Sequence, residues 1–195
     1  MKRLLGLALV LALLPGLTAR AEFYEYFPDV PDDTEYAYAV NALAEMGIIT
    51  GDGNGNFNPD NTMTRADFAT IVIRLIGEEE RAMEITESSF SDVPSNHWAC
   101  GYIMTAAELG LITGDGKGRF MPNDTLLYEH AVTLLIKVLG YEDEAQAAGG
   151  WPNGYLTVGN EIELTANTSA IKGQPTKRGT VAILIYNAIK PIFYQ

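Results

Sequence analysis

Two arginines lie where a cation could bind an anionic ligand. Arg65 follows Thr64 in the sequence Thr-Arg-Ala-Asp, which is typical of a helix start with Thr64 as N-cap and Asp67 bonding back to it. A cation in the first turn opposes the helix dipole, so this position favours a ligand or a carboxylate partner for Arg65. Arg178 precedes a similar apolar segment, whereas Tyr128 stands at the matching position between the two. A purely structural ion pair with a neighbouring carboxylate is the alternative for both arginines.

The stretch 52–60 resembles the beginning of a calcium-binding loop, because it combines Asp and Asn with Gly. The remainder does not fit. Phe57 takes the sixth position, where such a loop needs Gly, and Met63 takes the twelfth, where it needs a bidentate Glu. The matching loop later in the chain carries Lys117 and Arg119 at the would-be ligand positions. Turn residues whose Asp side chains bond local backbone N–H groups explain the stretch better, so we predict no metal site.

No set of residues combines a nucleophile, a base and a group that orients them. His97 and His130 are the only histidines and lie in different predicted elements. Cys100 is the only cysteine, which excludes an intrachain disulfide, and we predict that it is a small buried residue. The 25 acidic residues include no distinctive pair for glycoside cleavage. We therefore predict no catalytic residue, no enzyme activity and no cofactor.

The elements that must position these residues come from an internal repeat. At a single offset of 63 residues, 27–31 aligns with 90–94, and 47–53 aligns with 110–116, without a gap. In the second copy, a helix is predicted from about 97 to 109, ended by a glycine, and a second helix ends at Leu139. Copies of one helix–loop–helix unit therefore build the fold.

The second helix of each unit carries the same apolar stripe, which also reveals a third unit that lacks the Gly-Asp-Gly loop. The three stripes are Phe68, Ile71, Val72, Leu75 and Ile76; Ala131, Leu134, Leu135, Val138 and Leu139; and Val181, Leu184, Ile185, Ala188 and Ile189. One helix pair cannot bury its stripe alone, so we expect the three to meet near a pseudo-threefold axis. The predicted class is mainly α, with repeats at 22–82, 83–145 and 146–195 joined by linkers at 78–81 and 141–150.

Residues 1–21 resemble a secretory signal peptide, with a basic start, an apolar run and a small-residue cleavage site. No later segment is long and apolar enough to span a membrane. Of the 13 basic residues three lie before residue 22, so ten remain against 25 acidic ones, a net charge of −15. Such a surface repels nucleic acid and anionic lipid, and an anionic ligand must be bound by a local basic cluster.

Several motifs in this order resemble S-layer homology repeats. They are Phe-x-Asp-Val, His97-Trp98-Ala99, Gly-x-Ile-Thr-Gly-Asp-Gly, Phe-x-Pro and Thr-Arg-Ala-Asp, with Trp151–Tyr155 and Arg178–Ala182 similar to a divergent later repeat. The resemblance implies a secreted three-pronged module that docks non-covalently onto bacterial cell-wall glycans. It implies secondary wall polysaccharides, often pyruvylated, or peptidoglycan-linked glycans as partners, and grooves between repeats as the binding sites.

The resemblance also makes the Thr-Arg-Ala-Asp arginine a ligand contact. A guanidinium can hold the carboxylate of a pyruvyl ketal, and an indole can stack on a sugar ring. Arg65, Arg178, Trp98 and Trp151 supply these groups, although the sequence leaves open which Arg shares a groove with which Trp. Because Tyr128 replaces the arginine of the second unit, we expect fewer than three competent grooves.

Three alternatives stay open at this stage. The two tryptophans could be core anchors between the prongs instead of sugar contacts. The chain could associate with itself or with another surface protein in a structural lattice. It could also be a wall-glycan hydrolase that uses carboxylates without a recognisable motif.

Overall fold

A computed structural model describes residues 27–193 of the chain, and the predicted signal peptide lies outside the described residues. The predicted mainly helical class is confirmed, since this part of the chain forms eight helices and no strand. They are α2 (Ala37–Glu45), α3 (Arg65–Leu75), α4 (Glu79–Glu84), α5 (Cys100–Glu108), α6 (Tyr128–Val138), α7 (Glu142–Ala147), α8 (Asn153–Glu161) and α9 (Arg178–Phe193). None of these helices has the length and apolar character that a membrane span requires.

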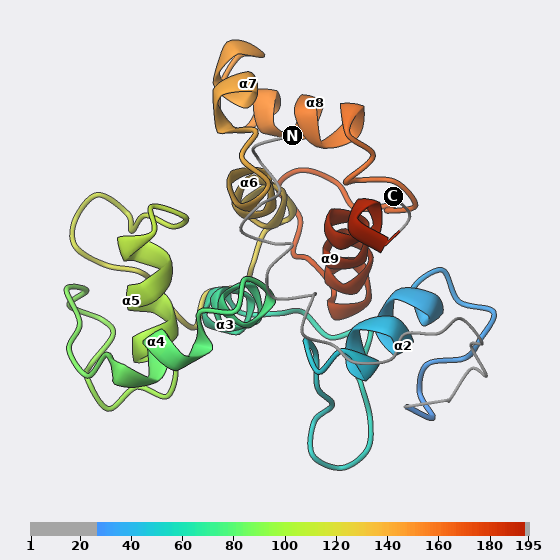
Figure 1. Ribbon diagram of the computed structural model, residues 1–195, viewed down its shortest axis with the longest axis horizontal. Helices are drawn as coiled ribbons and strands as arrows, with labels where there is room; N and C mark the ends of the chain where they lie inside the picture. The colour runs from blue at the N-terminus through green and yellow to red at the C-terminus, as the bar shows by residue number, and fades with distance from the viewer. Residues whose placement is uncertain (1–26, 194–195) are drawn as a thin grey trace.

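Three helices lie at the centre of the molecule, and the other long helices pack outside them. Figure 1 shows α3, α6 and α9, the second helices of the predicted repeats, near the middle, with α5, α8 and α2 further out. α5 contacts α3, α8 contacts α6, and α2 of the first repeat contacts α9 of the last. The first helix of each repeat therefore packs on the second helix of another repeat, and we call each such pair of helices a prong.

A closed ring of backbone hydrogen bonds joins the segments that lead into the three inner helices. Met63 N donates to Thr176 O at 3.3 Å, Thr176 N donates to Leu126 O at 2.8 Å, and Leu126 N donates to Met63 O at 2.8 Å. All three residues are buried. The ring pairs residues at sequence offsets of 63 and 50, the two offsets that align the apolar stripes. It fixes the inner helices in one register, while the pseudo-threefold axis itself stays a prediction.

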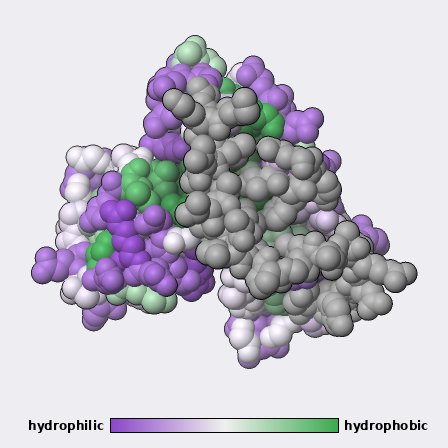
Figure 2. All heavy atoms as spheres, viewed as in Figure 1, coloured by the Kyte–Doolittle hydropathy of each residue, from purple (hydrophilic) through white to green (hydrophobic). Residues whose placement is uncertain are grey.

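The apolar stripes form one core. Their buried members in the largest cluster are Phe68, Val72, Leu75, Ala131, Leu134, Leu135, Leu139, Val181, Leu184, Ile185, Ala188 and Ile189. Ile71, Ile76 and Val138, at the stripe edges, are partly buried and pack against the same cluster. The outer surfaces of the prongs are largely hydrophilic on the face seen in Figure 2. Because there is no disulfide to hold the described residues, this burial is the main source of stability.

The two predicted linkers are partly helical, because α4 begins within 78–81 and continues to Glu84, and α7 lies within 141–150. α4 and α7 pack against α5 and α8, the helices that follow them. Gly101 and Gly154 allow this packing, since a Cβ on either would overlap the carbonyl oxygen of Ala82 or Ala145. The prediction for the helix start at His97 is wrong, because α5 begins at Cys100 after a series of turns.

Two aspartates fix the glycine loops from a distance. The Asp29 carboxylate accepts hydrogen bonds from Phe57 N at 2.8 Å and Asn58 N at 2.6 Å. The Asp92 carboxylate accepts from the matching backbone groups of Phe120, at 2.8 Å, and Met121, at 2.7 Å. These bonds place the two phenylalanines, whose rings and carbonyl groups then support the candidate site.

Candidate ligand-binding grooves

Two grooves lie where different repeats meet. Groove A has a volume of about 550 Å³ and is lined by Arg65, the loop 111–115, Phe120, one face of α6, and Trp151 and Tyr155. Groove B has a volume of about 170 Å³ and is lined by Arg178, residues 48–50, Phe57, one face of α3, and Trp98. Each groove therefore receives residues from three repeats.

The structure settles which arginine shares a groove with which tryptophan. Arg65 lies with Trp151, and Arg178 lies with Trp98. The reason is the exchange of helices between repeats, because α8 packs on α6 and α5 packs on α3. Trp98 and Trp151 each precede their outer helix by two residues, as their predicted alignment required.

Each arginine is held by a phenylalanine of the loop beside it. Arg65 Nε donates to Phe120 O at 3.0 Å, and Arg178 Nε donates to Phe57 O at 2.8 Å. In each case the guanidinium carbon also lies 4.6 Å from the centre of that phenylalanine's ring, in a cation–π arrangement: Arg65 over Phe120, and Arg178 over Phe57. The predicted capping box of Thr64 and Asp67 is present and starts the helix that carries Arg65.

The outer nitrogens of the two arginines differ in what they contact. Arg178 Nη2 donates to Thr50 O at 3.0 Å. For Arg65, no hydrogen bond or ion pair to either Nη is found within residues 27–193. Burial lowers the pKa of Arg65, and the carboxylates of Asp124 and Asp92 oppose that shift. The guanidinium keeps its charge at neutral pH, so its Nη groups are positioned to donate to an anion in groove A.

The two tryptophans are exposed. Trp98 and Trp151 have 59% and 56% of their surfaces open to solvent, so the alternative that they are core anchors is wrong. A histidine ring stacks on each: His97 on Trp98 with centroids 5.8 Å apart, and His130 on Trp151 with centroids 5.9 Å apart. An exposed indole at the rim of a groove offers an apolar face to a sugar ring.

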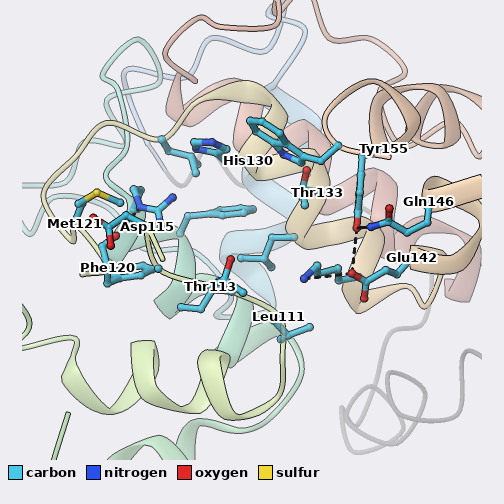
Figure 3. A pocket seen from close by; sticks show the side chains of 18 residues that line it. Leu111, Thr113, Asp115, Phe120, Met121, His130, Thr133, Glu142, Gln146 and Tyr155 are labelled. Carbon is cyan, nitrogen blue, oxygen red and sulfur yellow. Dashed lines mark hydrogen bonds and ion pairs between the residues drawn. The ribbon is translucent and has the colours of Figure 1, made fainter. Parts of the chain in front are cut away.

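Each groove also contains a second cation, which was missed in the sequence. In groove A, Lys137 Nζ lies 3.4 Å from Glu142 Oε1, and the Tyr155 hydroxyl donates to the same carboxylate oxygen at 3.1 Å. Figure 3 shows this Glu142–Tyr155 pair with Gln146 at one end of the groove and Phe120 at the other. The ammonium group of Lys137 is therefore held in the groove lining by a carboxylate that Tyr155 also fixes.

Groove B repeats the same arrangement with arginine. Arg74 Nε donates to Glu79 Oε1 at 2.8 Å, and the Tyr102 hydroxyl donates to that oxygen at 2.6 Å. The hydrogen bond from Tyr102, together with Arg74, lowers the pKa of Glu79. The 63-residue offset aligns Arg74 with Lys137 and Glu79 with Glu142, so this signal was available in the sequence.

In the second repeat, Tyr128 occupies the position of Arg65 and Arg178. Tyr128 is buried, with 6% of its surface exposed, and its hydroxyl is 2.9 Å from Thr168 Oγ1. A buried neutral side chain with a satisfied hydroxyl cannot hold a carboxylate as a guanidinium does. This agrees with the expectation that fewer than three grooves are equipped in the same way.

The remaining candidate residues have structural explanations. Asp52 Oδ1 accepts from Asn54 N at 2.8 Å and from Asn56 N at 3.1 Å, so its loop is built on local hydrogen bonds as predicted. Cys100 is buried, with 3% of its surface exposed, and burial raises the pKa of its thiol. His97 Nδ1 accepts from Ala99 N at 3.1 Å, just before α5 begins.

Comparison with known proteins places the chain among cell-surface proteins. A family model described as "S-layer homology domain" matches residues 26–69 and 89–132. A "Cell surface protein" of Thermoanaerobacter kivui is 37% identical over 84% of this chain, which spans 21% of that protein. A "Middle cell wall protein" of Brevibacillus brevis is 30% identical over 81% of the chain and 15% of its own length. An "Amylopullulanase" of Thermoanaerobacterium thermosulfurigenes is 30% identical over 61% of the chain and 6% of its own length.

Proposed function

Because the chain belongs to the S-layer homology domain family, we propose that it anchors protein at the bacterial cell surface by binding wall polysaccharide in grooves A and B. Two of the relatives above, the "Cell surface protein" and the "Middle cell wall protein", are named for a location at the cell surface or wall. One observation carries the binding proposal. A half-buried arginine seated on a phenylalanine ring faces an exposed tryptophan in two separate grooves. An exposed tryptophan buries little apolar surface, so stability alone does not explain why one lies beside the arginine in both grooves.

The chemistry of the two groups fits an acidic glycan. A guanidinium with free Nη groups can hold a carboxylate through two parallel hydrogen bonds, as a pyruvyl ketal requires. The exposed face of Trp151 can carry the apolar side of the attached sugar ring. The overall negative charge of the chain does not prevent this, because the guanidinium of Arg65 places a local positive charge in the lining of groove A. A pyruvylated secondary wall polymer and a peptidoglycan-linked glycan are the candidate ligands.

The family and the relatives' names point to a surface module that is not itself an enzyme. The relative named for an enzyme activity matches this chain over 6% of its length, so its activity is not transferred here. Self-assembly is the second candidate function, favoured by relatives named "Surface layer protein" and "S-layer protein". Sheets that form with rising protein concentration in the absence of glycan would support it. Release of reducing sugar from wall polymer would support a hydrolase.

Retention on purified cell-wall sacculi tests the proposed function. We expect Arg65→Ala to weaken retention by at least about tenfold, because a charge-assisted pair contributes about 1.5–3 kcal/mol. Arg178→Ala removes a hydrogen-bond donor from groove B and should also weaken retention, and the double variant should abolish it. Arg65→Lys keeps the charge and should bind with intermediate affinity, because an ammonium lacks the planar pair of donors. Added pyruvylated disaccharide should release the wild-type chain.

Arg81→Ala is the matched control. Arg81 lies on α4, pairs with Glu108 at 3.0 Å, and lines neither groove. This variant removes the same charge from the chain and should be retained like the wild type. Equal retention of the wild type and the folded Arg65/Arg178 double variant would refute polysaccharide binding in these grooves.

A further inference from the structure

The two grooves are built from matching residues, which makes their differences informative. The matched pairs, with groove A first, are Arg65 and Arg178, Phe120 and Phe57, Thr133 and Thr70, Lys137 and Arg74, and Trp151 and Trp98. At one lining position the chemistry changes: groove A has His130 where groove B has Asp67. In the adjoining loops Arg119 corresponds to Asn56 at the same 63-residue offset. Both changes make groove A more positive.

Both carboxylates that line groove A are paired with cations other than Arg65. Lys137 is balanced by Glu142, and Asp115 is balanced by Arg119, whose Nη2 lies 2.7 Å from its carboxylate. Arg65 forms no ion pair with either lining carboxylate, and the carboxylates of Asp124 and Asp92, which oppose the lowering of its pKa, lie outside the groove lining. The lining of groove A therefore holds no unpaired carboxylate that would repel an anion bound at Arg65.

In groove B a carboxylate that acts on the arginine belongs to the groove lining itself. Asp67 lines the groove, and its charge is the first to oppose the lowering of the pKa of Arg178 that burial causes. Asp29, the counterpart of Asp92, and Asp52 also act on Arg178, so three carboxylates act on this arginine and two act on Arg65. Arg74 is balanced by Glu79. The net charge around Arg178 therefore opposes a second carboxylate.

His130 lies where an anion would contact it. It is half-buried in the first turn of α6, its ring stacks on Trp151, and its Nδ1 is shielded from solvent without a hydrogen-bond partner in the described part of the chain. Arg65 from α3, Asp115 from the loop, Glu129 beside it, and Lys137 and Glu142 beyond it are the charged groups around it. Figure 3 shows His130 between the Asp115 end and the Tyr155 end of the groove. Burial and the charge of Arg65 lower the pKa of His130, so it is mainly neutral at pH 7.

We propose that groove A binds a glycan that carries a carboxylate and that groove B binds an uncharged sugar. The residue that decides this difference in ligand charge is His130 in groove A and Asp67 at the matching position of groove B. The proposal rests on the proposed function and names the ligand class of each groove. The volumes agree with it. At about 550 Å³ groove A falls within the usual range of roughly 300–1,000 Å³ for small-molecule sites, whereas groove B, at about 170 Å³, has room for less.

The chain contains two tryptophans, and each reports on one groove. In a ¹H–¹⁵N spectrum of the full chain, the two indole N–H signals can be assigned with the Trp98→Phe variant. The probes are a pyruvylated disaccharide, which carries a carboxylate, and its methyl ester, which does not. We expect the acid to shift the Trp151 signal at concentrations about tenfold lower than the ester does. At Trp98 we expect the ester to bind at least as well as the acid.

Exchanging the charges should reverse this preference. His130→Asp should weaken the acid at Trp151 by at least about tenfold and leave the ester within about twofold, because it adds a carboxylate beside the ligand. Asp is compatible with the fold there, since Asp67 occupies the same helix position in α3. His130→Asn is a second variant that removes the imidazole without adding charge, and it should weaken the acid less than Asp does. Asp67→Asn should tighten the acid at Trp98.

Two results would overturn the proposal. One is an acid-over-ester preference that is equal at both tryptophans. The other is an acid affinity at Trp151 that His130→Asp does not change. If retention on sacculi still depends on Arg65 and Arg178, the proposed function stands and the assignment of ligand classes fails. If the wild-type chain is not retained on sacculi at all, the proposed function fails first.

Discussion

Gly154→Ala should destabilise the protein, although glycine-to-alanine changes at compatible helix positions usually stabilise by about 0.4–1 kcal/mol. Gly154 is the second residue of α8, just after Trp151 and its turn. A Cβ at this position would overlap Ala145 O and lie 3.2 Å from the carbonyl carbon of the same residue. The obstacle is backbone, and Ala145 is fully buried, so no side chain can move aside.

The size of the effect follows from what the new methyl group must displace. Separating α7 from α8 costs about 1–3 kcal/mol as overpacking of a tight contact. It also strains the hydrogen bond from Gly150 N to Ala145 O, now 3.0 Å long, which contributes about 0.5–1.5 kcal/mol. After subtracting the usual gain from alanine, we expect a net loss of about 1–3 kcal/mol. For a domain of this size that is a fall in melting temperature of about 4–8 °C at the middle of the range.

Thermal and urea unfolding, followed by circular dichroism, measure this loss. The control is Asn160→Ala, an exposed position in the same helix, which should stabilise by about 0.5 kcal/mol because only helix propensity changes. A Gly154→Ala variant that melts at or above the wild-type temperature would refute the close approach of α7 and α8. Gly101→Ala applies the same test to α4 and α5, where the added Cβ would overlap Ala82 O.

Two further predictions concern the glycine loops. Asp92→Ala should lower the free energy of unfolding by about 2–4 kcal/mol, because it removes the acceptor of two charge-assisted bonds from Phe120 N and Met121 N. Urea unfolding measures this, and an effect below about 0.5 kcal/mol would contradict it. The pKa values of Asp52 and Asp115 are lowered to about 2, chiefly by backbone N–H groups of their own loops. A lowered pKa in the folded state means that both carboxylates stabilise the fold above their unfolded pKa of 3.8, and that this contribution is lost as the pH falls towards about 2. The double Asn variant should show a shallower loss of stability over that pH range, and an unchanged slope would contradict the prediction.

Most of the fold was predictable because its signals are local or periodic. The capping box at Thr64, the left-handed glycine at Gly110 and the three apolar stripes all follow from short stretches of sequence. The start of α5 was not, because the turns from Pro94 to Ala99 compete with helix and only the packed prong decides between them. The helices in the linker regions were not predicted for the same reason. α4 and α7 are six residues long, too short to be stable helices alone, and they exist because they pack on α5 and α8.

The candidate site divides in the same way. Arg65, Arg178, Trp98 and Trp151 were identified from residue type and repeat position, and the structure brings all four into grooves. The roles of Lys137 and Glu142 needed Tyr155, which lies in another repeat and completes their network. The sequence aligned these residues with their counterparts but gave no distance between them.

By itself, the sequence determined the repeated unit, most of its helices and the candidate residues for a glycan site, because each depends on spacing within about one helix–loop–helix unit. Only the tertiary structure decided that Arg65 meets Trp151 and that Arg178 meets Trp98. The physical reason is that an isolated helix pair cannot bury its apolar stripe, so each inner helix is covered by the outer helix of the next repeat. That exchange brings residues of three repeats together in one groove, and contacts between distant segments leave no mark in the local sequence.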